Sequence, residues 1–454
     1  MPRLLRSSIG HWVDPADAFV RLFGDQTDVV WLDSGAAAGS GRSYLGKASR
    51  VVTSDTQPSL LDFLRAELAA DRIDTSTDTD SVGFALGWVG WLGYETRFET
   101  MGVPRTRNSP YPDAAFLYLD RAIEFDHATR EVSLLSLVDD AGWRESVADA
   151  LFAAGPSTSS GSGVAPLPEL APLPELVEGP PEARWRDTDD EYLTKIRECQ
   201  ARIAAGDAYL LCLTTQVRVE TTRDPVATYL ALRASSPSHH GALLRIGDLA
   251  LLSSSPEQFL SVTPGGLIES RPIKGTRPRG PTPESDAAIA ADLASSEKER
   301  AENLMIVDLM RNDIGTVSEI GSVEVPNLLE IESYAQVHQL VSTVRGQLRD
   351  DLVGMDAVVA CFPAGSMTGT PKSSATRILD SLEGAPRGIY SGAFGYFGLD
   401  GRIDLAMVIR SIVLSPSGAT IGSGGGITAL SDPAEELAEV KLKAAALLRA
   451  LGVQ

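Results

Sequence analysis

The spacing of apolar and polar positions predicts many short strands and a smaller number of amphipathic helices. Apolar runs bounded by turn residues predict strands at residues 29–32, 83–93, 115–119, 122–125, 209–217, 242–246, 249–253, 393–397, 405–414 and 420–422. Helical spacing predicts helices at residues 58–71, 142–154, 188–206, 297–310 and 433–451. This mixture predicts an α+β fold with large antiparallel sheets and helices on the outside. A nucleotide-binding glycine loop between a strand and a helix is missing from the pattern.

One segment interrupts this pattern. Residues 155–183 are rich in proline, glycine and serine, and the hexapeptide APLPEL occurs twice in tandem at 165–176. Proline at this density removes backbone donors and favours extended, solvated chain. We therefore expect a linker or surface loop between an N-terminal region, residues 1–154, and a C-terminal region, residues 184–454.

Composition and charge exclude several classes of protein. The 454 residues are 43% hydrophobic and 22% charged, with a formal net charge of −21. A general nucleic-acid or anionic-membrane binder needs a basic face, which this balance disfavours. The first residues carry no long apolar core, and no apolar run approaches the roughly 18 residues of a membrane-spanning helix. We therefore expect a cytosolic protein that binds neither nucleic acid nor membranes.

The cysteines and histidines do not form a recognisable metal or disulfide pattern. The three cysteines, Cys199, Cys212 and Cys361, are too scattered for a disulfide framework or a CxxC site. The five histidines show no HExxH or HxxxH spacing. A zinc or haem enzyme is therefore not expected.

Residues 272–280, PIKGTRPRG, place a single amine in a cationic stretch punctuated by proline and glycine. We interpret this stretch as a rigid loop in which Lys274 can act as a nucleophile towards a small anionic substrate. Arg277 and Arg279 supply donors suited to carboxylates and, together with burial, are expected to lower the pKa of Lys274. The commoner meaning of such a loop is a solvated surface.

Two pairs of glutamates have the i, i+3 spacing that puts both side chains on one face of a helix. Glu436 and Glu439 share their face with Lys443, and Glu299 and Glu302 form the second pair. Oxygen ligands from two helices are what Mg²⁺ takes, with its other positions left to water and substrate. The alternative is a solvent face laced with ion pairs.

Further candidate residues lie in loops and at strand ends. The stretch 423–427, SGGGI, offers open amide donors for an anion, and 363–372, PAGSMTGTPK, is a second glycine- and hydroxyl-rich loop. Arg410 lies in the apolar stretch IDLAMVIRSIVL, where a buried guanidinium needs an anionic partner. Glu257 follows a strand at a proline turn, and Tyr390 precedes a Ser-Gly pair. Each of these also has an ordinary structural interpretation, as a flexible turn, a rim acid or a packed aromatic ring.

Taken together, these segments resemble the chorismate-utilising enzymes, the family that includes the anthranilate, aminodeoxychorismate, isochorismate and salicylate synthases. The likeness rests on SSSPEQF, RPIKGTRPRG, AENLMIVDLMRND, PAGSMTGTPK, GIYSGAFGYFG, DLAMVIRS, GSGGGI and the final Glu-x-x-Glu-x-x-x-Lys, in family order. In the N-terminal half, GWVGWLGYE and PDAAFLYLD are also similar. The resemblance implies the fold of that family, with the sheets packed as a sandwich.

The resemblance also implies a chemical role for each candidate. Lys274 would be the covalent nucleophile and Glu257 the proton donor. Mg²⁺ would be bound directly by Glu302 and Glu439, and through water by Glu299 and Glu436. The residues implied to surround chorismate are Gly275, Thr276, Ser366, Tyr390, Arg410, Gly424, Gly425, Gly426 and Lys443.

The lysine at position 274 selects a branch within the family. Anthranilate synthases carry alanine there, in PIAGT, whereas the enzymes that aminate chorismate at C4 carry lysine. The resemblance therefore implies conversion of chorismate and ammonia to 4-amino-4-deoxychorismate, on the route to p-aminobenzoate and folate. It also implies a separate glutamine amidotransferase subunit that supplies the ammonia.

Two other functions stay open at this point. The first is another reaction of chorismate, of the anthranilate or isochorismate synthase type, which analysis of the product distinguishes. The second is a non-catalytic regulatory subunit that binds chorismate or an amino acid. The presence of Lys274, Glu257 and both glutamate pairs disfavours this second alternative.

Overall fold

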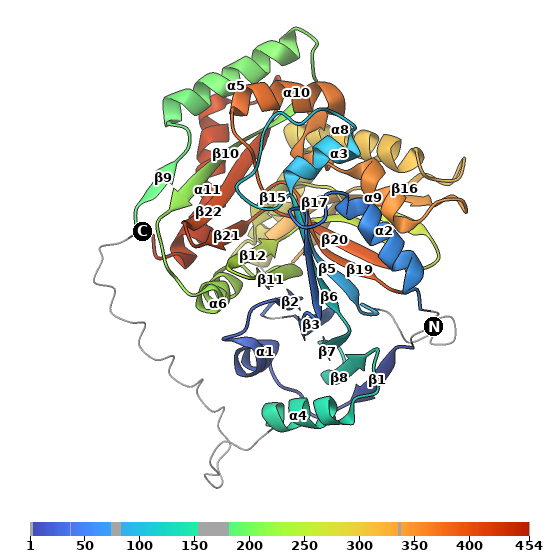
Figure 1. Cartoon of the computed structure of the whole chain (residues 1–454). Coiled ribbons are helices and arrows are strands. Elements are labelled where there is room, and N and C mark those ends of the chain that lie inside the picture. The colour runs from blue at the N-terminus through green and yellow to red at the C-terminus, as the bar shows by residue number, and fades with distance from the viewer. Residues whose placement is uncertain (1–2, 37, 74–82, 153–180, 335–336, 454) are drawn as a thin grey trace.

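The computed structural model describes residues 3–36, 38–73, 83–152, 181–334 and 337–453 (Figure 1). Most of the predicted linker, residues 155–180, lies outside this part of the chain. Two large antiparallel sheets face each other, and helices cover their outer faces. The predicted α+β sandwich is therefore confirmed.

The first sheet has twelve strands among the described residues. Its order is β1 (Leu5–Ser8), β8 (Glu131–Ser136), β7 (Arg121–Asp126), β3 (Arg42–Lys47), β2 (Val29–Asp33), β11 (His240–Ile246), β12 (Leu249–Ser255), β21 (Ser411–Ser415), β22 (Gly418–Ile427), β10 (Leu210–Val219) and β18 (Gly369–Thr370), with β9 (Ala183–Trp185) paired to β10. The pairing of β2 with β11 joins the two regions of the chain that flank residues 153–180.

The second sheet has ten strands in the described part of the chain. Its order is β15 (Ile273–Pro278), β17 (Val337–Gln347), β14 (Leu267–Ser270), β13 (Gln258–Val262), β20 (Ile403–Met407), β19 (Ala393–Gly398), β5 (Gly87–Leu92), β6 (Ala114–Leu119) and β4 (Arg50–Thr53), with β16 (Glu324–Ser333) paired to β17. Here β19 pairs with β5, so both regions of the chain build this sheet as well.

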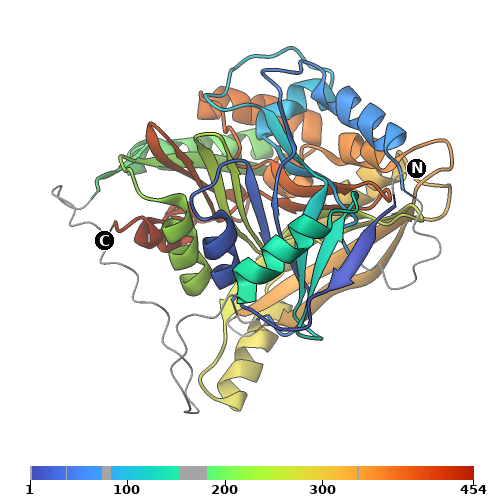
Figure 2. The same ribbon diagram turned by 60° about the horizontal axis from the view of Figure 1, so that its bottom comes forward.

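The core follows the two-residue period of the strands. Val30 and Val89 point into the apolar layer between the sheets, whereas their neighbours Trp31 and Trp88 point outwards under the helices. Helices α2 (Leu60–Ala70), α8 (Glu297–Gly315) and α9 (Gly354–Cys361) pack on the second sheet. On the first sheet pack α1 (Pro15–Phe23), α4 (Ala141–Phe152), α6 (Pro225–Ser235) and α11 (Pro433–Ala450), with α4 in front of the strands in Figure 2.

Two further helices complete the layer beside β10 and β22. Helix α5 (Asp189–Ala204) begins at a capping box formed by Thr188 and Glu191. It packs with α10 (Lys372–Glu383) and α11 around a separate apolar cluster. Helix α7 (Pro283–Ser295) contacts β15 and β17. Among the described residues, no helix is both long enough and apolar enough to cross a lipid bilayer.

The predicted strand at residues 405–414 is wrong, because the structure divides it. Arg410 has a φ of 51°, a left-handed conformation that no strand accommodates. The chain turns there, so that β20 lies in the second sheet and β21 in the first. Apolar character alone could not reveal this turn, since both halves are buried.

A short 3₁₀ turn, η1 (Tyr94–Thr96), brings a carboxylate into the interior and continues into the short helix α3 (Arg97–Thr100). Glu95 is 2% exposed and accepts hydrogen bonds from the backbone N–H groups of Arg387, at 3.0 Å, and Gly388, at 2.8 Å. Burial outweighs these bonds and raises the pKa of Glu95 from 4.5 to about 7.

We predict that Glu95 makes the fold less stable as the pH rises from about 4.5 to about 7. In this window the unfolded chain releases the proton whereas the folded chain retains it, so the free energy of unfolding falls, by up to about 3 kcal/mol. Urea unfolding at about pH 5 and about pH 7.5 measures the fall, which should be smaller in Glu95→Gln. An equal fall in both proteins would contradict the prediction.

Candidate active site

Lys274 lies on a strand and not in the loop expected from the sequence. It belongs to β15, which pairs with β17 and carries a bulge between Lys274 and Thr276. Gly275 forms the bulge with a φ of 74°, which favours glycine. The Lys274 side chain is 14% exposed, and its Nζ lies 3.9 Å from Oε2 of Glu302. The amine is therefore enclosed and faces α8.

The charges around Lys274 differ from the expectation. Arg279 pairs with Asp286 at 2.6 Å, away from the candidate glutamates, whereas Arg277 pairs with Asp292 and with Glu299, one of those glutamates. Burial of the Lys274 side chain favours the neutral form of its amine and so acts to lower its pKa.

The nearby Glu302, Cys212, Glu257 and Glu299 nevertheless raise the pKa of Lys274 above its ordinary value. The expectation that the pKa of Lys274 is lowered is therefore wrong for the protein without bound ions or substrate.

Glu257 is a buried acid at the end of a strand. It follows β12, its residue is 7% exposed, and its carboxyl group interacts with the hydroxyl of Ser366 in the 3₁₀ turn η2 (Gly365–Met367). Burial raises the pKa of Glu257, although Lys274, the Ser366 hydroxyl and Lys443 partly offset this effect. An acid that retains its proton above the ordinary range suits the role of proton donor.

The glycine-rich stretch at residues 423–427 is part of a strand, which corrects the predicted loop. β22 pairs with β10 without interruption from Ala419 to Ile427. A methyl group added to Gly426 would lie 3.3 Å from Oε2 of Glu302 and 3.7 Å from Nζ of Lys274, and one on Gly425 would lie 3.0 Å from Oε2 of Glu436. The glycines let these charged side chains approach the backbone of β22.

Helices α8 and α11 bring the two glutamate pairs towards this strand. Glu302 and Glu436 are buried, and burial together with Glu299 and Glu436 raises the pKa of Glu302 to about 7, although Lys274 opposes the rise. Carboxylates from both helices therefore lie within electrostatic reach of one another. Glu439 is paired with Lys443 at 2.8 Å, and the Lys443 ammonium also donates to the carbonyl of Gly424 at 2.9 Å.

Lys298 also belongs to this group, although it was not predicted from the sequence. Its Nζ donates to Oε1 of Glu436 at 2.7 Å, and Ser431 donates to the same oxygen at 2.7 Å. The signal was present in the sequence, because Lys298 precedes Glu302 by four residues and so lies on the same face of α8. Lys298 and Lys274 together balance part of the negative charge of the glutamates.

The glutamates fit a magnesium ion by their chemistry. Their oxygens are the donors that Mg²⁺ prefers, and burial, with a smaller contribution from Glu299 and Glu436, keeps the pKa of Glu302 raised although Lys274 and Lys298 oppose the rise. Within the described part of the chain, no three potential ligands already lie close enough together to hold a metal ion. Binding would thus require the side chains to turn from their lysine and arginine partners towards the ion.

The remaining predicted substrate contacts are partly gathered here. Tyr390 packs its ring against Gly422 of β22. Burial lowers the pKa of Arg410, although Glu439 and Tyr390 partly offset this effect. No hydrogen bond or ion pair links the Arg410 side chain to another described residue, which leaves its donors for an external anion. The Thr276 side chain is exposed on β15 and is not drawn into the group.

A cavity of about 380 Å³ lies elsewhere on the molecule. It opens between α2 and the segment that follows η1, where Glu99, Arg105 and Asp113 line it. None of the candidate residues described above contributes to this cavity, so we do not assign it to the same site.

These observations define a protein in which a buried amine, a buried acid and paired carboxylates surround a glycine strand. The chain belongs to the family of chorismate binding enzymes, which it matches over residues 27–449. The family resemblance found in the sequence is thereby confirmed.

The chain is also similar to individual proteins whose names state a particular reaction. An aminodeoxychorismate synthase of Streptomyces griseus is 45% identical over 99% of this chain, which spans 64% of that protein. Anthranilate synthase component 1 of Streptomyces coelicolor is 35% identical, over 97% of this chain and 86% of its own length. The crystal structure of anthranilate synthase component I from Streptococcus pneumoniae superposes with a TM-score of 0.76 at 27% identity, covering 98% of this chain and 99% of that one.

Proposed function

We propose that this chain aminates chorismate at C4 and so carries out the synthase reaction of an aminodeoxychorismate synthase. The product, 4-amino-4-deoxychorismate, leads to p-aminobenzoate and folate. The observation that carries the proposal is the enclosed amine of Lys274, 3.9 Å from Glu302 and beside the glycine strand β22. The similarity to the Streptomyces griseus enzyme supports the same reaction.

The arrangement of residues supports a double displacement. Lys274, once deprotonated, attacks C2 of chorismate while the diene shifts and the C4 hydroxyl leaves as water, with the proton supplied by Glu257. Ammonia then attacks C4, the diene shifts back and the amine of Lys274 departs. This route divides the displacement of a poor leaving group into two easier steps.

The anionic substrate needs positive partners on this chain. Arg410, whose side chain makes no hydrogen bond or ion pair with another described residue, would bind one carboxylate, and the amides of the glycine strand would bind the same end. Mg²⁺, held directly by Glu302 and Glu439 and through water by Glu299 and Glu436, would bind the other carboxylate and offset the charges that raise the pKa of Lys274. Lys443 would keep its hydrogen bond to the carbonyl of Gly424 and so hold β22 in place.

The chain's own cysteines do not favour a glutaminase activity. Cys199, Cys212 and Cys361 are all buried, and burial raises the pKa of each thiol, so they stay as unreactive thiols. We propose that a separate glutamine amidotransferase subunit or domain supplies the ammonia. The relatives named aminodeoxychorismate synthase are longer than this chain, which leaves room for such a part.

The pure chain, incubated with chorismate and Mg²⁺, tests the proposal when the nitrogen source is varied. We expect 4-amino-4-deoxychorismate with ammonium and no aminated product with glutamine alone, as measured by mass spectrometry. A product that has lost its enolpyruvyl group as pyruvate would indicate an anthranilate synthase. Amination with glutamine alone would contradict the need for a separate glutaminase.

A further inference from the structure

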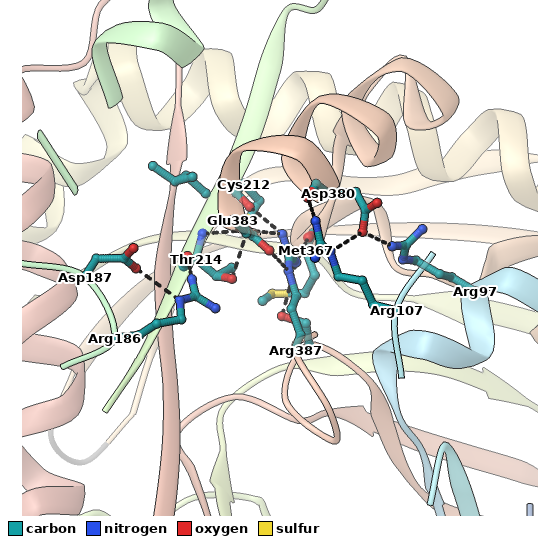
Figure 3. Close-up of polar contacts among 12 residues, drawn as sticks. Arg97, Arg107, Arg186, Asp187, Cys212, Thr214, Met367, Asp380, Glu383 and Arg387 are labelled. Atoms are coloured by element: carbon teal, nitrogen blue, oxygen red, sulfur yellow. Dashed lines mark hydrogen bonds and ion pairs between the residues drawn. The ribbon is translucent and has the colours of Figure 1, made fainter. Parts of the chain in front are cut away.

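Arg387 and Glu383 form a buried ion pair at the C-terminal end of α10 (Figure 3). Nη2 of Arg387 lies 2.7 Å from Oε1 of Glu383, and Nε lies 2.9 Å from Oε2, with side chains 1% and 3% exposed. Removing both charges from water costs free energy that packed apolar side chains avoid. The pair is therefore poorly explained by stability alone.

The guanidinium uses all five of its N–H donors. Two go to Glu383, and the others go to the backbone carbonyls of Met367, at 2.6 Å, and Cys212, at 2.9 Å, and to the hydroxyl of Ser391, at 3.3 Å. Its face lies 4.2 Å from the ring centroid of Tyr94. The Arg387 side chain is thus held by acceptors on separate segments of the chain. It also links these segments to one another.

One of these segments carries the partner of the proposed proton donor. Met367 directly follows Ser366, whose hydroxyl lies near enough to the carboxyl group of Glu257 to favour its charged form. Because Arg387 holds the carbonyl of Met367, it restricts the η2 turn from which Ser366 reaches Glu257. Without that bond, the turn would be free to shift relative to the acid.

The second segment is β10, which lies beside the glycine strand. Cys212 is paired in register with Gly426, the residue next to Glu302 and Lys274. Oε1 of Glu383 accepts both the N–H and the hydroxyl of Thr214, each at 2.9 Å, and so attaches the ion pair to the same strand. Arg387 and Glu383 therefore connect the Ser366 turn to the strand pair that faces the reactive amine.

We propose that Arg387, held by Glu383, is a positioning residue that fixes the Ser366 turn against β10 and thereby aligns Glu257 with Lys274. This inference rests on the proposed function for its kinetic consequence, but its structural part stands independently. All five N–H donors of Arg387 are used within the protein, so none is left for the substrate. The effect of Arg387 is on the alignment of the acid, and hence on turnover more than on binding of chorismate.

The first test compares Arg387→Lys with Arg97→Lys in the ammonia-dependent reaction. Arg97 is a matched control, because it is also buried and paired to α10, through Asp380 at 2.8 Å, but contacts neither Met367 nor β10 (Figure 3). Lysine retains the charge but lacks the planar fork of donors. We expect kcat of Arg387→Lys to fall about 100-fold with KM for chorismate within about threefold, and Arg97→Lys to keep both within about threefold.

A double variant tests whether Arg387 acts through Ser366. If it does, adding Arg387→Lys to Ser366→Ala should lower kcat by no more than about threefold beyond Ser366→Ala alone, because the connection has already been removed. Losses that multiply in the double variant would overturn this route of action.

Hydrogen exchange provides a measure that does not depend on turnover. The N–H groups of Met367 and Thr368 are bonded within the η2 turn, to Ala364 and Gly365. We expect both to exchange at least about tenfold faster in Arg387→Lys and in the isosteric Glu383→Gln, and at the wild-type rate in Arg97→Lys. Unchanged exchange, or equal acceleration in Arg97→Lys, would overturn the inference. Failure of the wild type to convert chorismate would refute the proposed function alone.

Discussion

Replacement of Lys274 by alanine is expected to abolish amination of chorismate with ammonium present, with a loss of about 10⁴-fold or more in kcat. The Lys274 side chain is enclosed, and its amine faces Glu302 and the glycine strand. Alanine leaves no amine at this position to attack the substrate. Steady-state assays with a saturating ammonium concentration measure the loss. The variant should still fold, because its neighbours on β15 and β17 stay paired.

Lys195 provides the matched control for this variant. It is also partly buried, at 21% exposed, and is paired with an acid, Asp187, at 2.6 Å, but it lies on α5 outside the proposed site. Lys195→Ala should therefore keep its activity within about threefold. Wild-type turnover by Lys274→Ala would refute the covalent role.

Replacement of Glu302 by glutamine is expected to lower kcat about a thousandfold and to weaken Mg²⁺ binding, as followed by calorimetry. Glutamine has the same shape but removes one of the carboxylates that the two helices direct towards the strand. Its loss also removes the nearest negative charge from Lys274. Chelation of the metal should abolish activity in the wild type, and added Mg²⁺ should restore it.

Glu297 lies on the same helix and supplies the control. It is in the first turn of α8 and is exposed, so Glu297→Gln should bind Mg²⁺ and turn over as the wild type does. Undiminished Mg²⁺ affinity in Glu302→Gln would contradict the proposed ligand set. Full activity of the wild type in excess chelator would contradict any role for the metal.

The strand pattern and the final helix could be predicted because both follow from local periodicity. The face shared by Glu436, Glu439 and Lys443 is present on α11, and the adjacent stripe is buried at Val440 and Leu447. Helical geometry fixes such relationships regardless of the rest of the fold. The sandwich of antiparallel sheets could also be predicted, because the apolar pattern indicated antiparallel sheets and the family resemblance implied their packing as a sandwich.

The surroundings of Lys274 could not be predicted in the same way. Proline and glycine near it indicated a loop, but pairing with β17, more than sixty residues later in the sequence, extends the backbone into a bulged strand. Arg277 and Arg279 were expected near the amine, yet their acids come from α7 and α8. Local residue types specify which charges are available, whereas the fold decides which of them meet.

The surroundings of the buried Arg387–Glu383 pair could not be predicted from the sequence either. Its i, i+4 spacing is visible in the sequence and would ordinarily indicate a surface ion pair on a helix. Only the fold brings the carbonyls of Cys212 and Met367 to the guanidinium, since these residues lie on different elements. A role in the site therefore became apparent only from the assembled contacts.

The central claim is that Lys274 bonds to the ring of chorismate before nitrogen arrives. Intact-protein mass spectrometry of the chain mixed with chorismate and Mg²⁺, without ammonium, tests it most directly. We expect a species heavier than the free protein by the mass of chorismate less one water, located at Lys274 by peptide mapping and lost when ammonium is added. Complete amination without this species at any time after rapid mixing and quenching would disprove the covalent step.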